Sequence, residues 1–67
     1  MIDRFVTADK KVIAEACEAM RLGKEFKTTV LRPRNDVGFR EQHWRGYVTQ
    51  LARFGDDIQI EINRHDI

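Results

Sequence analysis

The sequence predicts one small α+β domain in which a single N-terminal helix is followed by three or four antiparallel strands. Apolar residues recur every three or four positions in the first third of the chain, whereas they alternate with polar residues in the last third. Glycine and proline separate these segments. Because 67 residues suffice for only one core, residues 1–67 are assigned to one domain.

The helix is expected from about residue 8 to residue 22. Val12, Ile13 and Ala16 fall on one face at helical spacing. Thr7 is a suitable N-cap, and Gly23 follows where a left-handed C-cap residue belongs. The N-cap, the apolar face and the C-cap therefore all indicate the same helix.

Strands are expected at about 25–32, 39–42, 44–53 and 57–63. Pro33 ends the first, and residues 34–38 have the composition of a loop. Gly46, inside the long strand, predicts a bend or a close backbone contact. The last strand alternates Ile58, Ile60 and Ile62 with polar residues.

Both faces of the long strand carry apolar side chains, with Val48 on one face and Tyr47 and Leu51 on the other. Such a strand is covered on both sides, which favours a strongly curved sheet or a small barrel with the helix at one end. A flatter sheet with one face on the helix is the other packing that the element order permits.

Several functional classes are excluded by what the sequence lacks. No apolar run approaches the roughly 18 residues of a membrane helix, and the N-terminus has no signal-peptide pattern. A single cysteine, Cys17, cannot form an internal disulfide; it is expected to be buried on the helix, and it indicates a reducing cytoplasm. The spacing of His43 and His65 matches no zinc motif, so neither a metal nor another cofactor is predicted.

Catalysis is not predicted either. The chain contains no phosphate-binding glycine loop and no nucleophile motif. Asp56 and Asp57 are adjacent, so they would point to opposite faces of a strand and are better interpreted as turn residues. We therefore expect a protein that is not an enzyme.

Charge is segregated along the chain. Residues 21–53 contain eight Lys or Arg against three Asp or Glu, whereas residues 54–67 have one Arg against four Asp or Glu. The basic middle third interleaves arginines with aromatic residues, and the candidate binding residues are Arg32, Arg34, Arg40, Arg45, Arg53, Trp44 and Phe39. Arginine forks bind phosphate, and exposed aromatic rings stack on bases. Because Trp44 and Phe39 border the predicted loop, they are expected to be exposed.

The first functional hypothesis is a small regulatory module that binds nucleic acid, with single-stranded RNA or DNA favoured over duplex. The alternative is a small protein-binding regulator or inhibitor, of the kind that phages, plasmids or stress-response genes encode, because arginine and tryptophan also anchor protein interfaces. A solvated basic face around a core of aromatic residues explains the same pattern without any ligand. The charge segregation is also compatible with a homo-oligomer.

The order of these segments resembles that of the Sm/Hfq-like small β-barrel proteins. The matching pieces are Thr28–Leu31, Trp44–Leu51 with its glycine, and Ile58–Ile62, within about residues 8–63. The resemblance implies an SH3/Sm-like barrel with RNA as its partner. Ala52 stands where the family places Asp, and no Asn precedes the last aliphatic residues, so the family's uridine pocket is not implied. A related branch binds the transcription terminator Rho, which fits the protein-binding alternative.

Overall fold

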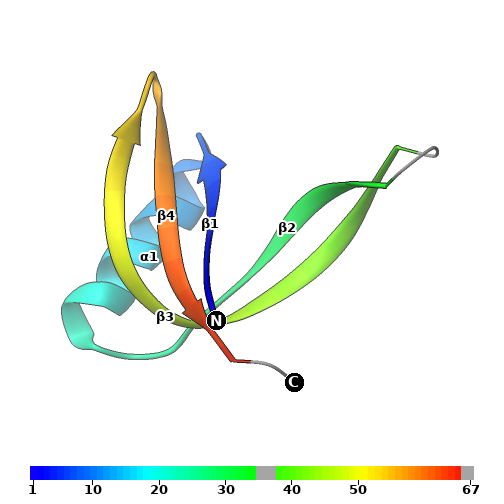
Figure 1. Cartoon of the computed structure of the whole chain (residues 1–67). Coiled ribbons are helices and arrows are strands. Elements are labelled where there is room, and N and C mark those ends of the chain that lie inside the picture. The colour runs from blue at the N-terminus through cyan, green and yellow to red at the C-terminus, as the bar shows by residue number, and fades with distance from the viewer. Residues whose placement is uncertain (35–37, 66–67) are drawn as a thin grey trace.

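A computed structural model describes residues 1–34 and 38–65 and shows a four-stranded antiparallel sheet with one helix (Figure 1). The sheet order is β1-β4-β3-β2. The elements along the chain are β1 (Ile2–Thr7), α1 (Lys10–Leu22), β2 (Phe26–Arg34), β3 (Gly38–Phe54) and β4 (Asp57–Arg64). α1 is neither long nor apolar enough to span a membrane, and it is the only helix in the described part of the chain.

The predicted fold class is wrong in two respects. The helix is not N-terminal, because β1 precedes it and pairs with β4, Phe5 lying opposite Ile60. The sheet neither closes nor curls strongly, since β1 and β2 are its two edges and each pairs with only one neighbour. β1 was missed because it is short and carries Asp3 and Arg4, although its residues alternate between exposed and half-buried.

Other boundaries differ less. Residues 39–42 and 44–53 belong to one continuous strand, β3. Asp9, not Thr7, caps α1, because its carboxylate accepts a hydrogen bond from the Lys11 backbone N–H at 3.0 Å. Gly23 has the predicted left-handed conformation, with φ of 68°. In the predicted loop 34–38, Arg34 and Gly38 belong to β2 and β3, and residues 35–37 lie outside the described residues.

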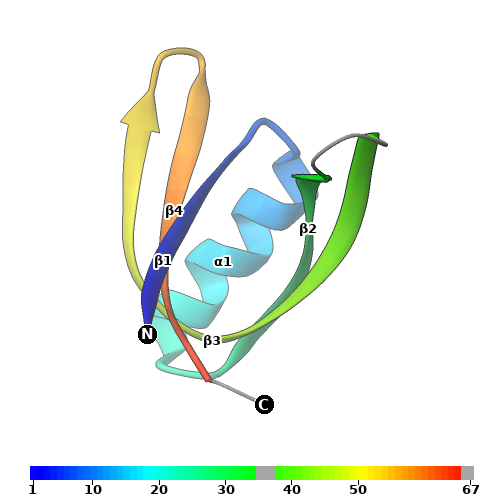
Figure 2. The same ribbon diagram turned by 45° about the vertical axis from the view of Figure 1, so that its right-hand side comes forward.

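The core lies between α1 and one face of the sheet (Figure 2). Ala16 and Ala19 are the buried residues of α1, and their small side chains let the helix approach the strands closely. The buried residues of the sheet are Phe26, Trp44, Val48, Ile60 and Ile62. The face of the sheet that these residues occupy is called the inner face below, and the opposite face is the outer face.

β3 changes partner at Gly46. Residues 38–46 of β3 pair with β2, and residues 46–54 pair with β4, so Gly46 lies opposite both Phe26 and Arg64. A Cβ atom at Gly46 would lie 2.0 Å from the Asn63 carbonyl oxygen. This confirms the close backbone contact predicted from the sequence. From this point the β2–β3 and β3–β4 hairpins diverge (Figure 1).

Candidate nucleic-acid interface

The β2–β3 hairpin forms an arm, defined here as residues 26–34 and 38–46. Because β4 pairs with β3 only from Gly46 onward, the arm is a two-stranded ribbon along most of its length. Neither long edge of this ribbon has a strand partner in the described part of the chain. Figure 1 shows the arm leaving the body formed by β1, β4 and α1.

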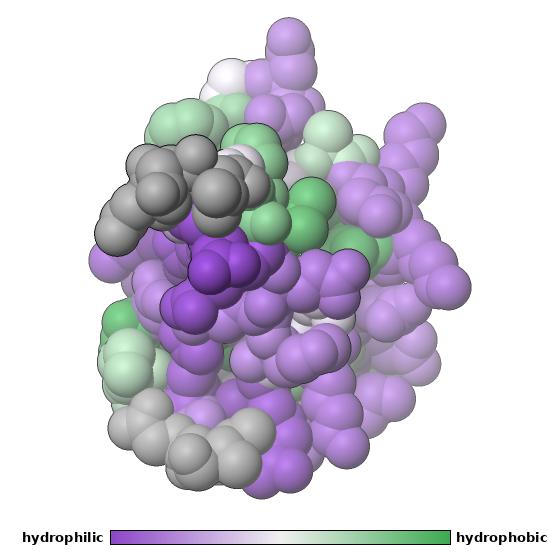
Figure 3. Space-filling model, turned by 90° about the vertical axis from the view of Figure 1, so that its right-hand side faces the viewer, coloured by the Kyte–Doolittle hydropathy of each residue, from purple (hydrophilic) through white to green (hydrophobic). Residues whose placement is uncertain are grey.

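Three of the predicted arginines share the inner face of this arm. Arg32 and Arg40 lie directly opposite one another across the ribbon, and Arg34 is two positions farther along β2. Residues opposite one another in an antiparallel pair, and residues two apart in a strand, point to the same face. We call Arg32, Arg34 and Arg40 the arginine face. Viewed from the side of the arm, the surface is mostly hydrophilic (Figure 3).

Among the described residues, the positive charges of the arginine face outnumber the carboxylates that pair with them. Like charges placed directly across a strand pair repel each other and lower stability. Arg32 has a partner, because one of its terminal nitrogens lies 3.4 Å from Asp3 Oδ2. No carboxylate among the described residues lies within ion-pair distance of Arg34 or Arg40. An external anion close to Arg32 and Arg40 would offset the repulsion between these two opposed like charges.

Trp44 is buried at the root of the arm, with 1% of its surface exposed. The Arg64 and Arg32 guanidinium carbons lie 4.4 and 5.0 Å from its ring centroid, and the Phe5 ring meets it edge-on at 5.1 Å. The expectation that Trp44 is exposed is wrong. It lies opposite Thr28 on the inner face, so it packs into the core and is not available to stack on a base.

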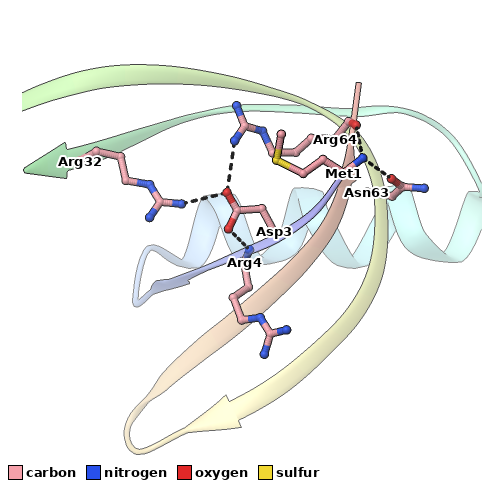
Figure 4. A network of polar contacts seen from close by, with 6 residues as sticks. All are labelled: Met1, Asp3, Arg4, Arg32, Asn63 and Arg64. Carbon is pink, nitrogen blue, oxygen red and sulfur yellow. Dashed lines mark hydrogen bonds and ion pairs between the residues drawn. The ribbon is translucent and has the colours of Figure 1, made fainter. Parts of the chain in front are cut away.

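Asp3 holds both arginines that flank Trp44 (Figure 4). Its Oδ2 accepts hydrogen bonds from Arg32 at 3.4 Å and from Arg64 at 3.2 Å, while Oδ1 accepts from the Arg4 backbone N–H. One carboxylate thus connects β1, β2 and β4 beside the buried ring. Two N–H groups here, Arg32 Nε and Trp44 Nε1, are buried and have no partner among the described residues. Asp3 holds the Arg32 side chain in place. Because one carboxylate serves two guanidinium groups, Arg32 and Arg64 are only partly neutralised.

The outer face of the arm carries the remaining predicted residues of this hairpin. Phe39 is 69% exposed, as expected from the sequence, and it lies opposite Pro33. Nearer the root, Lys27 lies directly opposite Arg45. These two cations, with Thr29 and His43, line an open hollow of about 330 Å³.

Within this hollow the Thr29 hydroxyl and His43 Nδ1 are 3.2 Å apart. Arg45 Nε lies 3.6 Å from a Glu25 carboxylate oxygen, and His65 contacts the same oxygen at 3.2 Å. The outer face therefore has a second pair of like charges across the ribbon, Lys27 and Arg45. Of these two, Arg45 is partly neutralised by Glu25.

The structure thus divides the seven predicted residues. It brings Arg32, Arg34 and Arg40 together, places Phe39 and Arg45 on the opposite face, and buries Trp44 between the arm and the body. Arg53 lies apart from all of these, opposite Ile58 in the β3–β4 hairpin.

Sequence reasoning missed Lys27, Arg64 and Asp3 as members of the site. Arg64 follows the alternation of Ile60 and Ile62, so its inward direction was predictable in principle. Its contact with Asp3 depends on β1, which was not predicted.

The other candidate groups that the sequence contains are the potential metal ligands and the single cysteine. No group of three His, Cys, Asp or Glu side chains among them is placed to hold a metal ion. Cys17 is exposed on α1, which contradicts its expected burial.

Comparison with known proteins adds no identification, because no protein-family model, curated protein or solved structure matches this chain. The functional assignment therefore depends on the geometry of the arm.

Proposed function

We propose that this chain is a non-enzymatic nucleic-acid-binding module that contacts phosphates through the arginine face of its arm. The observation that carries the proposal is the placement of Arg32 directly opposite Arg40, with Arg34 beside them, on one face of a two-stranded ribbon. Guanidinium groups bind phosphate oxygens in bidentate geometry. A phosphate backbone supplies closely spaced negative charges that offset the repulsion within the arginine face.

The described counter-ions favour Arg34 and Arg40 as the main phosphate contacts. Arg32 already shares Asp3 with Arg64, so its guanidinium is oriented and partly neutralised. Arg34 and Arg40 have no described carboxylate within ion-pair distance, and both are exposed. We therefore expect their removal to weaken binding without weakening the fold.

A protein-binding regulator is the second candidate, and one observation favours it. Leu31 and Phe39 are 64% and 69% exposed, and with Pro33 they form an apolar surface near the end of the arm. Exposed aromatic side chains are enriched at protein interfaces. On this alternative the arm contacts a larger protein that has an acidic surface.

The test is fluorescence anisotropy of labelled 20-nucleotide DNA, single-stranded and duplex, titrated with the protein at about 100 mM salt. We expect Arg34→Ala/Arg40→Ala to bind about 10-fold or more weakly than wild type, since two phosphate contacts are lost. Arg21→Ala/Arg53→Ala is the matched control, because it removes the same charge from exposed positions outside the arm.

Three results would decide between the alternatives. A loss confined to the arm variant supports the proposal. An equal loss in both double variants shows that only net charge matters, and it contradicts an interface on the arm. Absence of binding by wild type to either DNA removes DNA as the ligand and favours the protein partner. Emission of Trp44, the only tryptophan, reports whether each variant is folded.

A further inference from the structure

We infer that the outer face of the arm carries a second anion site, which binds one phosphate group near the root of the arm. The site is the open hollow of about 330 Å³ that is bordered by Lys27, Thr29, His43 and Arg45. α1 packs against the inner face and leaves these four side chains exposed. The site goes beyond the proposed function, because the arginine face lies on the opposite side of the ribbon.

The four side chains form two directly opposed pairs, Lys27 with Arg45 and Thr29 with His43. The backbone indicates how close these pairs are, since the His65 N–H donates to the Arg45 carbonyl oxygen at 2.8 Å. A strand residue directs its N–H and its C=O to the same neighbouring strand, so Arg45 bonds to β4 and not to Lys27. Both pairs are therefore of the non-hydrogen-bonded kind, in which opposed Cα atoms are about 4.5 Å apart and the side chains approach most closely.

Lys27 and Arg45 supply the positive charge of the hollow. Among the described residues, no carboxylate lies within ion-pair distance of Lys27. Arg45 Nε lies 3.6 Å from Glu25 Oε2, which is longer than the roughly 2.7–2.9 Å of a charge-assisted hydrogen bond. His65 Nε2 contacts the same oxygen at 3.2 Å. A phosphate placed between the two cations would offset their repulsion and accept hydrogen bonds from both.

The Thr29–His43 pair supplies a further donor, whichever ring nitrogen of His43 carries the proton. The Thr29 hydroxyl and His43 Nδ1 are 3.2 Å apart. If Nδ1 is unprotonated, the hydroxyl donates to it and the Nε2–H can donate to a ligand. If Nδ1 carries a proton, it donates to Thr29 Oγ1 and the hydroxyl proton is available instead. Since Lys and Arg side chains have no acceptor, the hollow is rich in donors and suits a compact oxyanion such as phosphate.

The experiment is an NMR titration of the protein with inorganic phosphate, compared with sodium chloride at the same ionic strength. We expect saturable shifts that are largest at the four residues of the hollow. Lys27→Gln should weaken phosphate binding about 5-fold or more, because a charged donor is lost. Thr29→Val keeps the shape and the charge but removes the hydroxyl, and it should weaken binding about 3-fold or more. Lys11→Gln is the matched control, since Lys11 is exposed on α1, and it should leave the affinity unchanged.

A second arm identifies the source of the phosphate group. Fluorescence anisotropy compares one 20-nucleotide strand of DNA with and without a 5′-phosphate. Tighter binding of the phosphorylated strand, lost in Lys27→Gln, supports the site and assigns it to the end of a nucleic acid. Equal affinity of the two strands, together with the shifts caused by inorganic phosphate, supports the site and assigns it to a free phosphate compound.

The remaining outcomes separate this inference from the proposed function. Equal shifts with sodium chloride, or shifts that extend to Arg21 and Arg53, show a general charge effect and overturn the site. Phosphate shifts confined to the arginine face also overturn it but leave the proposed function intact. Saturable shifts in the hollow without any binding of DNA support this inference and contradict the proposed function. An unaltered effect of phosphate in Lys27→Gln and Thr29→Val, both with the dispersed spectrum of a folded protein, overturns the assignment of these side chains.

Discussion

Gly46 is the residue on which the path of the chain depends most. It lies opposite Phe26 on one side and Arg64 on the other, and the backbone of β4 occupies the space that a side chain would need. The positions of Asn63 C and Arg64 Cα, 2.8 and 2.9 Å from a built Cβ, show that backbone and not a flexible side chain would have to move. The orientation of the arm relative to the body therefore depends on a glycine here.

We expect Gly46→Ala to lower the free energy of unfolding by about 3 kcal/mol or more, since the new methyl group overlaps backbone atoms. Urea denaturation followed by Trp44 emission measures this change. Gly55→Asn is the control: Gly55 has φ of 61°, which Asn tolerates, and no atom lies within 4 Å of its built Cβ. Similar stability of the two variants would show that β4 does not restrict position 46.

Asp3 is the second residue whose removal should be informative, because it offsets two guanidinium groups beside a buried ring. We expect Asp3→Asn to lower stability by about 1–2 kcal/mol in urea denaturation, since a charge-assisted contact with partly buried arginines is lost. The comparison is Arg4→Gln, which breaks the exposed Arg4–Glu61 pair at 3.7 Å and should cost less than about 0.5 kcal/mol. Equal losses would mean that the Asp3 cluster behaves as an ordinary surface ion pair.

Among the elements, α1 and β4 were predictable because each has a long, unambiguous period and clear end signals. β1 was not, because six residues that include Asp3 and Arg4 give little pattern without the partner strand. Whether the sheet closes into a barrel or stays open, as it does here, was not predictable from the sequence. It depends on whether the two edge strands reach one another, which is a property of the assembled fold and not of either segment.

The site was partly predictable, because side chains alternate between the two faces of a strand. Alternation places Arg32 and Arg34 on one face of their strand, but the residue opposite each of them depends on the register of the hairpin. That register puts Arg40 with them and Phe39 and Arg45 on the other face. Trp44 was judged exposed from its nearness to a loop, whereas its position opposite Thr28 directs it into the core.

At the level of elements, the arm should open more readily than the body, because its strands pair on one side only whereas β4 is paired on both. Native-state hydrogen exchange measured residue by residue tests this. We expect amides of residues 30–32, 34 and 38–42 to exchange roughly 10-fold or more faster than those of residues 60–62 in β4; Pro33 has no amide hydrogen and is left out. Uniform protection across both groups would show that the arm and the body unfold as one cooperative unit.

At the level of the whole molecule, the net charge of +1 is the sum of +4 on the arm and −3 on the rest of the chain. A protein with such a distribution binds a polyanion through a few localised contacts and not through its total charge. Removing specific arginines of the arm should therefore change how many counterions binding releases, and removing equivalent charges elsewhere should not.

The most direct measurement is the slope of log Kobs against log salt for duplex DNA, from about 50 to about 200 mM salt. For Arg34→Ala/Arg40→Ala the magnitude of this negative slope should be lower than that of wild type by about 2, one for each lost phosphate contact. For Arg21→Ala/Arg53→Ala it should equal that of wild type. Equal slopes for wild type and the arm variant, with both folded, would contradict the assignment of phosphate binding to the arginine face.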